Sequence, residues 1–439
     1  MPGRLEIIFN FFQNRALKNL SWQLLEKFLQ ILNTLFIGAW IARYLGVEQF
    51  GVLSYAIAYN GLFLTLTTLG LDTLLVKYLV RNKKIRYYLI GTTFYLKIIA
   101  SVVIFFLVYI SLELTHQAVE IRNLVLILAS TNIVLSLSVL TQIYEASKKT
   151  GLIAKSNIIA LIISALVKIT LIVLELPILY FAVSYLIDGI VKSAINLIAY
   201  ERDFSEFIKW KFKKNIALSF LKNSWPLITS GVVISMYMRI DIIMIQYMVG
   251  SKAAGLYSVA EKLSTFSYFL PTILMGLIFP DLVNLERDRG KVFLVKVEKI
   301  FEYFFYLGLA VAILVFIFGK FVIDNIYGSE FTESIAILRV HAWTLVLVFM
   351  GLASNRILII KGLQKVDFFC KFFGLIINLI ANYFLIGRLG AIGAAYGTLI
   401  AYIFISYFSM FISSKTREIF FMQTRAFYPR NILFILRNK

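Results

Sequence analysis

Charged residues are scarce in this sequence. Asp, Glu, Lys and Arg make up 15% of its 439 residues, against about 25% in soluble domains. Hydrophobic residues make up 60%, and the apolar runs reach the roughly 20 residues that a membrane-spanning helix needs. Runs of that length also argue against an outer-membrane barrel, whose strands read as alternations of about ten residues. The composition therefore excludes a soluble enzyme and predicts an all-α membrane protein.

Cysteine and histidine are nearly absent. Cys370 is the single cysteine, so no disulfide can form within the chain, and His116 and His341 lie far apart in the sequence. We therefore predict no metal site. The nearest approach to a phosphate-binding loop, Gly250 to Gly255, is followed by Leu256 rather than by Lys. These absences predict a protein without cofactors, and one that moves a substrate rather than an enzyme that reacts with it.

Twelve apolar runs predict twelve membrane-spanning helices, and the basic residues predict their orientation. Of the 44 Lys and Arg residues, 31 fall in loops, in the termini or near the ends of runs on one side, 6 fall in loops or near run ends on the other side, and the remaining 7 are counted within the runs. The positive-inside rule then places both termini in the cytoplasm. The net charge of +20 is explained by this topology, so we expect no nucleic-acid partner. The runs are 19–42, 50–72, 88–112, 122–144, 156–174, 178–199, 223–248, 254–279, 303–323, 335–360, 367–387 and 391–413.

The two halves of the sequence share a motif. Gly46-x4-Gly51-x2-Ser54-x-Ala56 recurs 204 residues later as Gly250-x4-Gly255-x2-Ser258-x-Ala260. Both copies lie at equivalent places in the topology, which predicts a parallel repeat of two six-helix lobes. The predicted divisions are an amphipathic cytoplasmic lead-in (1–18), an N-lobe (19–200), a cytoplasmic linker (201–222), a C-lobe (223–413) and a basic cytoplasmic tail (414–439).

Seven cations lie inside the predicted spans, where each would cost about 2.5–3.5 kcal/mol at the bilayer centre. We expect Lys27, Lys262 and Arg356 to reach the membrane surface by snorkelling or to pack against neighbouring helices. The deeper cations need water or a partner, so we predict that they bind substrate in a hydrated cavity; structural interhelical hydrogen bonding is the alternative. These candidate substrate-binding residues are Lys97, Lys168, Lys192 and Arg239.

Three acidic residues in the spans are candidates for binding a coupling proton or sodium ion: Glu26, Asp188 and Asp241. Asp188 lies four residues before Lys192, a spacing that favours a direct ion pair. Asp241 is two residues from Arg239, about 200° around a helix. We therefore expect Arg239 to face the cavity and Asp241 to face a neighbouring helix or an ion site.

Pro271 falls in the middle of the run 254–279. Proline removes an internal hydrogen bond and kinks a helix. The position predicts either a gate or hinge, or a static kink.

Several stretches resemble the Wzx-type oligosaccharide (O-antigen) flippases, polysaccharide biosynthesis proteins of the multidrug/oligosaccharidyl-lipid/polysaccharide exporter superfamily. The hits lie in both halves of the chain. They are Ile41-Ala42-Arg43-Tyr44-Leu45-Gly46 with Phe50-Gly51, Leu69-Gly70-Leu71-Asp72, Arg239-Ile240-Asp241, and Leu389-Gly390 with Gly393-Ala394-Ala395.

The resemblance implies twelve helices in two pseudo-symmetric six-helix lobes around a central cavity that opens to alternate sides. It implies translocation of undecaprenyl-diphosphate-linked oligosaccharide repeat units to the outer leaflet of a bacterial cytoplasmic (inner) membrane. The products would be surface polysaccharides such as O-antigen, capsule or exopolysaccharide. The implied partners are this lipid-linked oligosaccharide, the lipid bilayer and other polysaccharide-assembly membrane proteins.

Two other functions remain open. A cation-coupled multidrug antiporter of the same fold would favour an acidic cavity, whereas cations predominate in these spans. A membrane polysaccharide polymerase would favour a large outer loop and no half-chain repeat. A purely structural scaffold would leave the buried charges unexplained.

Overall fold

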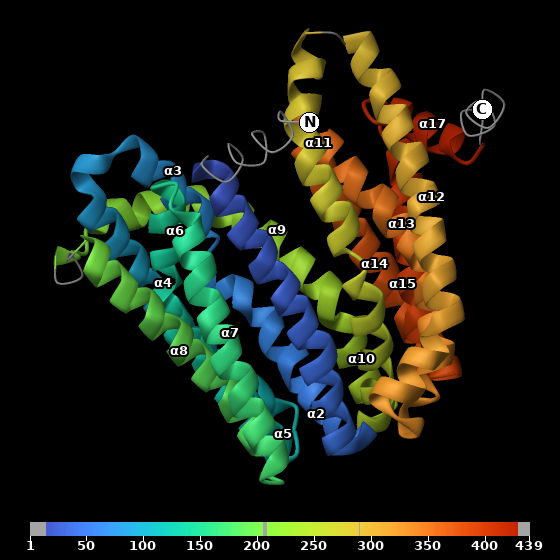
Figure 1. Ribbon diagram of the computed structural model, residues 1–439, viewed down its shortest axis with the longest axis horizontal. Coiled ribbons are helices and arrows are strands. Elements are labelled where there is room, and N and C mark those ends of the chain that lie inside the picture. Colours follow the sequence, from blue (N-terminus) through green and yellow to red (C-terminus); the bar gives the residue numbers. More distant parts are fainter. Residues whose placement is uncertain (1–14, 205–208, 289, 429–439) are drawn as a thin grey trace, which may run out of the picture. The chain divides into compact units, whose positions relative to one another are not determined.

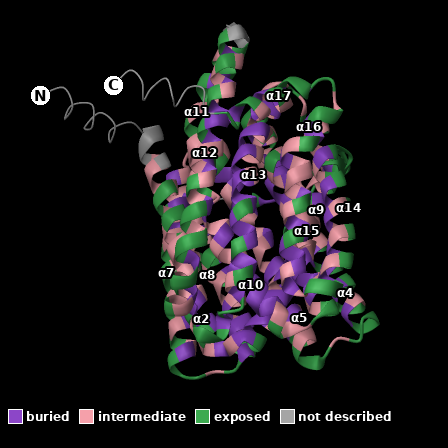
Figure 2. Cartoon of the chain, turned by 90° about the vertical axis from the view of Figure 1, so that its right-hand side faces the viewer, coloured by how far each residue is buried: buried purple, intermediate pink, exposed green. Residues whose placement is uncertain are grey.

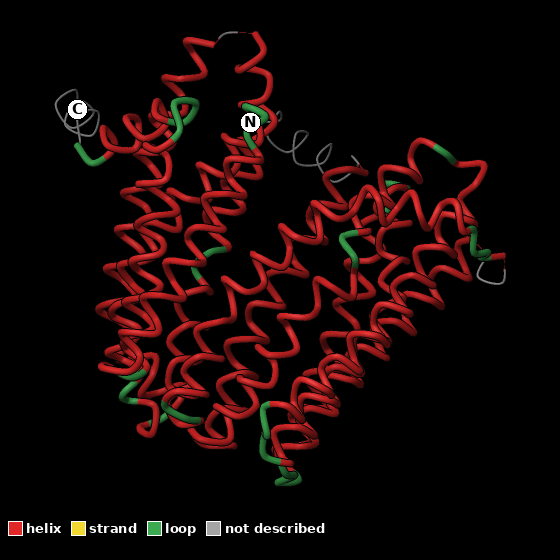
Figure 3. The backbone as a smooth tube through the Cα atoms, turned by 180° about the vertical axis from the view of Figure 1, so that it is seen from behind, coloured by secondary structure: helices red, strands yellow, loops and turns green. Residues whose placement is uncertain are grey.

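The computed structural model describes residues 15–204, 209–288 and 290–428, which contain helices and no β-strand (Figure 1). Residues 1–14 of the predicted lead-in and 429–439 of the predicted tail lie outside these ranges. The backbone within a bilayer must satisfy its own hydrogen bonds, and an apolar chain does so as helices. Short loops join most of these helices (Figure 3).

The helical elements follow one another along the chain with few residues between them. In order they are α2 (Arg15–Thr68), α3 (Leu71–Arg81), η1 (Lys83–Ile85), α4 (Arg86–Leu114), α5 (Val119–Val134), η2 (Leu135–Ser138), α6 (Val139–Ala146), α7 (Thr150–Val173), α8 (Ile178–Phe204), α9 (Lys214–Met248), α10 (Ser251–Phe266), α11 (Phe269–Asp288), α12 (Gly290–Val322), η4 (Ile323–Tyr327), η5 (Ser329–Phe331), α13 (Ser334–Ile360), α14 (Gln364–Leu389), α15 (Ala391–Ile403), η6 (Phe404–Phe408), α16 (Ser409–Ile412) and α17 (Arg417–Ala426).

Eleven helical stretches among the described residues are long and apolar enough to cross a membrane. The first, Ser21–Arg81, is 61 residues long, about three times what one crossing needs. Gly46 divides it, because its φ of 71° and ψ of 172° are not helical. The predicted spans 19–42 and 50–72 are thus the two arms of α2, which descend and return in Figure 1. Counting both arms gives twelve crossings and a multi-pass membrane protein.

Two compact units divide the chain. Unit 1 comprises Met1–Leu45 and Tyr55–Ser235, and unit 2 comprises Gly46–Ser54 and Met236–Lys439. Their boundary falls inside α9, whereas the predicted lobes end at the linker 201–222. Within that linker, α8 continues to Phe204 and α9 begins at Lys214. The lobe boundaries stay a prediction.

Each unit has its own apolar core. In unit 1 the side chains of α3, α4, α6 and α8 meet around Leu75, Leu89, Leu140 and Tyr144, all at most 2% exposed. In unit 2 the core includes Phe301 of α12 and Phe349 of α13, both fully buried. Buried positions are conspicuous along α10 and α13 in Figure 2. These cores hold the polar side chains described below in fixed positions.

The sequence repeat has a structural counterpart. Gly46 and Gly250 both have positive φ and extended ψ, at 71° and 172° and at 113° and 179°. Each glycine therefore allows a sharp turn into the helical segment that follows, a conformation that L side chains rarely adopt. Five residues later, Gly51 and Gly255 pack against each other inside unit 2. The two equivalent junctions thus turn alike and contact each other.

The predicted position of Pro271 within one continuous helix is wrong. The run 254–279 is broken at Ser267 and Tyr268, between α10 and α11. Pro271 is the third residue of α11, where its missing N–H removes no helical hydrogen bond. The prolines inside helices are Pro226 in α9 and Pro280 in α11. A hinge at Pro271 would therefore act between two helices and stays a prediction.

Candidate functional site

Lys97 on α4 is buried in unit 1 with an acidic partner. Its side chain is 2% exposed, and its ammonium group lies 2.5 Å from a carboxylate oxygen of Asp72 on α3. It also donates to the hydroxyl of Ser138 at 3.0 Å. The Asp72 side chain is 43% exposed, so the acid stands between the lysine and the surface of the unit. The cost of burying Lys97 is thus offset by an ion pair.

Lys168 on α7 has an equivalent arrangement. Its ammonium group lies 2.6 Å from Asp188 on α8 and 2.8 Å from the Ser164 hydroxyl. The ring of Tyr185 packs against it at 4.6 Å. The predicted pair of Asp188 with Lys192 is therefore not formed. A buried lysine on the adjacent helix binds the carboxylate instead, because an exposed lysine can reach water and a buried one cannot.

Lys192 is exposed on α8, within electrostatic range of Glu26 and Lys27. Glu26 on α2 is half-buried and accepts a hydrogen bond of 2.9 Å from the Asn157 side chain on α7. Lys27 is exposed and donates to Gln30 at 3.1 Å. Lys192 and Lys27 are thus the two exposed cations of this group.

The most elaborate polar cluster lies in unit 2 around Asp241 of α9. Its carboxylate is 9% exposed and accepts three hydrogen bonds from neutral groups. The donors are the hydroxyls of Tyr257 on α10 (2.7 Å) and Thr398 on α15 (2.6 Å), and the amide of Asn382 on α14 (2.6 Å). In the described part of the chain no Lys or Arg side chain pairs with this carboxylate. A buried carboxylate without a counter-charge is costly, so a bound cation or proton would lower the cost of burying Asp241.

The Asp241 cluster also contains polar atoms that make no hydrogen bond with the described residues. Asn378, one turn before Asn382, accepts a hydrogen bond from it at 3.3 Å. The Asn382 oxygen and the Asn378 amide nitrogen are buried, and neither has a partner among the described residues. His341 of α13, 3% exposed, packs its ring edge-on against Tyr257 at 5.3 Å. Several oxygen atoms therefore surround Asp241, as hard cations such as Na⁺ require.

Arg239 lies on another face of α9. Its side chain is half-buried, while that of Asp241 is buried. This agrees with the angle of about 200° between residues two positions apart. No carboxylate of the described residues lies within ion-pair distance of the Arg239 guanidinium. Arg239 can therefore bind an anion without first losing an acidic partner.

Two of the three cations for which snorkelling or helix packing was expected, Lys262 and Arg356 of unit 2, lie against aromatic rings. The Lys262 ammonium is 4.2 Å from the centre of the Phe50 ring, and the Arg356 guanidinium is 5.7 Å from that of Phe279. Both side chains are half-buried. The faces of aromatic rings attract cations, so these contacts partly replace water around the two charges.

The neutral members of the Asp241 cluster were not predicted from the sequence. Asn378 and Asn382 stand four residues apart, hence on one face of an otherwise apolar helix. Polar side chains so placed in a membrane span point to a partner inside the protein. That signal could have found them. Tyr257 and Thr398 carry no comparable signal, since both residue types are common in such helices.

The sequence of this chain is similar to that of a known protein family and of a protein from another organism. A family model described as polysaccharide biosynthesis protein matches residues 16–286. An uncharacterised membrane protein of Methanocaldococcus jannaschii is 24% identical over 443 residues, covering 93% of this chain and 85% of that protein.

Solved structures share the fold at low sequence identity. An inward-facing multidrug resistance MATE family transporter of the MOP superfamily superposes with a TM-score of 0.74 at 14% identity, over 94% of this chain and 98% of that one. The lipid II flippase MurJ, in an inward closed conformation, gives 0.67 at 14% identity, over 96% and 92%. The predicted fold class, an all-α membrane protein, is confirmed. Because the family model covers more than half of its length, the chain belongs to the polysaccharide biosynthesis protein family.

Proposed function

We propose that this protein is a flippase for undecaprenyl-diphosphate-linked oligosaccharide units. It would carry them from the cytoplasmic to the outer leaflet of the cytoplasmic membrane by alternating access. Membership in the polysaccharide biosynthesis family supports the pathway, and the shared fold with MurJ supports the type of movement. The observation that carries the proposal is the placement of Arg239 and Asp241 on different faces of α9.

A diphosphate cannot cross hydrocarbon without compensation for its charge. Arg239 supplies it, because a guanidinium can bind two phosphate oxygens at once. Lys192 is exposed and is proposed as a second contact. Lys97 and Lys168 already hold Asp72 and Asp188. They would bind phosphate only by exchanging these carboxylates for it, so we place them behind Arg239 in importance.

Asp241 is the proposed binding site for the coupling ion. Its carboxylate, the Thr398 hydroxyl and the side-chain oxygens of Asn378 and Asn382 are ligands suited to Na⁺, and the carboxylate alone could take a proton. Glu26 and Asp188 are weaker candidates, because Asn157 and Lys168 already bind them.

One helix would then connect the two binding events. A cation at Asp241 changes the charge on the packed face of α9, and phosphate at Arg239 binds another face of the same turn. Binding on either face shifts α9 only if the two states of the transporter differ in affinity for that ligand. The proposal therefore predicts that substrate and cation affect each other's affinity.

The direct test in cells is deletion of the gene. Complete lipid-linked repeat units should accumulate on the cytoplasmic leaflet, and surface polysaccharide should fall. The wild-type gene should restore export, Arg239→Ala should not, and Arg239→Lys should restore part of it, since charge remains without the two-pronged contact. Lys27→Ala is the matched control and should export normally. Unchanged polysaccharide with greater sensitivity to cationic drugs would instead favour a multidrug antiporter.

A further inference from the structure

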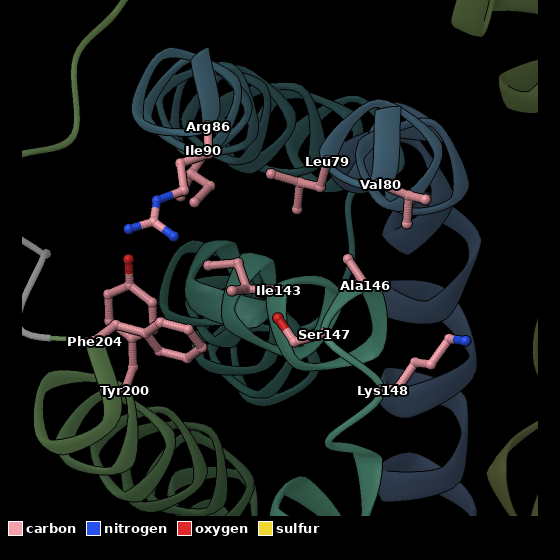
Figure 4. Close-up of a pocket in the computed structure, with 10 residues that line it drawn as sticks. All are labelled: Leu79, Val80, Arg86, Ile90, Ile143, Ala146, Ser147, Lys148, Tyr200 and Phe204. Atoms are coloured by element: carbon pink, nitrogen blue, oxygen red, sulfur yellow. The ribbon is translucent and has the colours of Figure 1, made fainter. Parts of the chain in front are cut away.

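A pocket of about 540 Å³ opens at one end of unit 1. Its walls come from the ends of α3, α4, α6 and α8 and from the turn after α6 (Figure 4). The ten lining residues are Leu79, Val80, Arg86, Ile90, Ile143, Ala146, Ser147, Lys148, Tyr200 and Phe204. The volume lies in the range of small-molecule binding sites, and no proposed role in transport uses it.

One wall of the pocket is rigid. Tyr200 is fully buried, and its hydroxyl accepts a hydrogen bond of 3.2 Å from the Trp210 ring nitrogen. The Phe204 ring packs on Tyr200 with centres 5.2 Å apart. Leu79, Ile90 and Ile143 belong to the apolar core of the unit. The cavity is thus held open by packed side chains and is formed before any ligand binds.

The lining is amphiphilic. Among the residues that the structure describes, its ionic members are Arg86 and Lys148, both basic. Figure 4 shows the Arg86 guanidinium directed toward the Tyr200 hydroxyl, with the Ser147 hydroxyl pointing into the space. Tyr87 accepts a hydrogen bond of 3.1 Å from Arg86 and so fixes it. Lys148 lies at the opposite rim with its ammonium directed outward.

The loop charges predict that the pocket lies at the level of the cytoplasmic lipid headgroups. Four helices reach it with their ends, next to basic segments that the positive-inside rule assigns to the cytoplasmic side. Basic pockets between helix ends on that side bind anionic lipid headgroups. The apolar walls match the first carbons of acyl chains, whereas a free anion would leave them in contact with water.

We propose that this pocket binds one anionic phospholipid of the cytoplasmic leaflet. The phosphate accepts hydrogen bonds from Arg86 and Ser147, Lys148 adds charge at the rim, and the glycerol end of the chains covers Leu79 and Ile143. The bound lipid joins the ends of α3, α4, α6 and α8. It therefore stabilises unit 1, as any ligand specific for the folded state does.

The experiment is native mass spectrometry of the full-length protein in neutral detergent. The probes are phosphatidylglycerol, phosphatidylcholine and inorganic phosphate, with the melting temperature measured in parallel. We expect one tightly held phosphatidylglycerol that raises the melting temperature, and neither effect from phosphatidylcholine or phosphate. Equal retention of phosphatidylcholine would overturn the assignment of charge. Displacement of phosphatidylglycerol by millimolar phosphate would overturn the assignment to a lipid.

Matched variants locate the site. Arg86→Gln should weaken phosphatidylglycerol binding about tenfold, since it removes a charged contact with the phosphate. Lys148→Gly should weaken binding less, since the Lys148 ammonium is directed outward and only adds charge near the rim. Lys148 has a φ of 55°, which glycine adopts without strain, so Lys148→Gly should keep its basal melting temperature. Lys84→Ala, an exposed cation outside the pocket, should bind like the wild type.

Ala146→Trp tests occupancy of the cavity, because it fills the space and keeps both cations. It should abolish retention of phosphatidylglycerol while the protein elutes as a single species. If Ala146→Trp still retains the lipid and Arg86→Gln does not, the headgroup binds to the outer surface, and the pocket assignment is wrong.

Discussion

Gly51 and Gly255 face each other so closely that neither position has room for a β-carbon. A β-carbon at Gly51 would overlap the carbonyl oxygen of Ser251, and one at Gly255 would overlap that of Val47. The contact is reciprocal, because Ser251 and Val47 are themselves equivalent in the sequence repeat. Two copies of one motif thus pack against each other reciprocally inside unit 2. The close contact between the two backbone segments explains why the repeat has glycine at positions 51 and 255.

Replacing either glycine should destabilise the protein. For Gly51→Ala and Gly255→Ala we expect a loss of about 1–3 kcal/mol, the cost of overpacking a close contact, seen as a lower unfolding midpoint in detergent. Gly276→Ala is the control, because nothing lies within 4 Å of a β-carbon there; it should gain about 0.5–1 kcal/mol. An unchanged midpoint for Gly255→Ala would contradict the close contact.

The ion pair of Lys168 and Asp188 should affect stability mainly because neither buried charge can be left without its partner. Lys168→Met leaves the carboxylate without its cation and should cost about 3 kcal/mol. Lys168→Met combined with Asp188→Leu should recover most of that loss, because no charge remains to be compensated. The measurement is a double-mutant cycle of unfolding midpoints, with Lys192→Ala as an exposed control. Additive losses would show that the two residues do not interact.

Asp241 should determine the response to the coupling ion. Binding of Na⁺ to the folded wild type should raise its melting temperature with concentration, relative to K⁺ at equal ionic strength. Asp241→Asn should abolish this rise with little change in fold, because the side chains are nearly the same size. Glu333→Gln, in an exposed ion pair with Lys252, is the control.

If Na⁺ has no effect on the wild type, proton coupling is the remaining form of the proposal. Transport should then respond to a proton gradient in the wild type and not in Asp241→Asn. A response of Asp241→Asn to either ion would exclude Asp241 as the site.

The loop charges predict the orientation in the membrane. Reporter fusions at Glu120 and Ser329 should lie outside the cytoplasm, and fusions at Lys84 and Lys213 inside. A fusion at Lys213 scored outside would contradict both the twelve-span topology and the parallel repeat.

The sequence predicted those features that depend on local pattern. Long apolar runs gave the helices, and the spacing from Gly46 to Ala56 gave the repeat. The separation of Arg239 and Asp241 followed from helical geometry alone.

Pairings between helices could not be predicted in this way. Asp188 was assigned to Lys192 because they share a helix, while its partner Lys168 lies on the adjacent helix. Which buried charge meets which depends on packing, and a single helix carries no information about its neighbours. The break before Pro271 was missed for a similar reason, since an apolar run does not show where one helix ends and the next begins.

The central claim is translocation of a lipid-linked diphosphate, and reconstitution tests it most directly. Purified protein in liposomes would be given a labelled undecaprenyl-diphosphate oligosaccharide, and its leaflet would be read with an impermeant modifying reagent. The wild type should move the label between leaflets, whereas Arg239→Ala, reconstituted to the same level, should match protein-free liposomes. Wild-type rates in Arg239→Ala would remove the proposed substrate contact, and no movement by the wild type under any ion gradient would contradict the flippase itself.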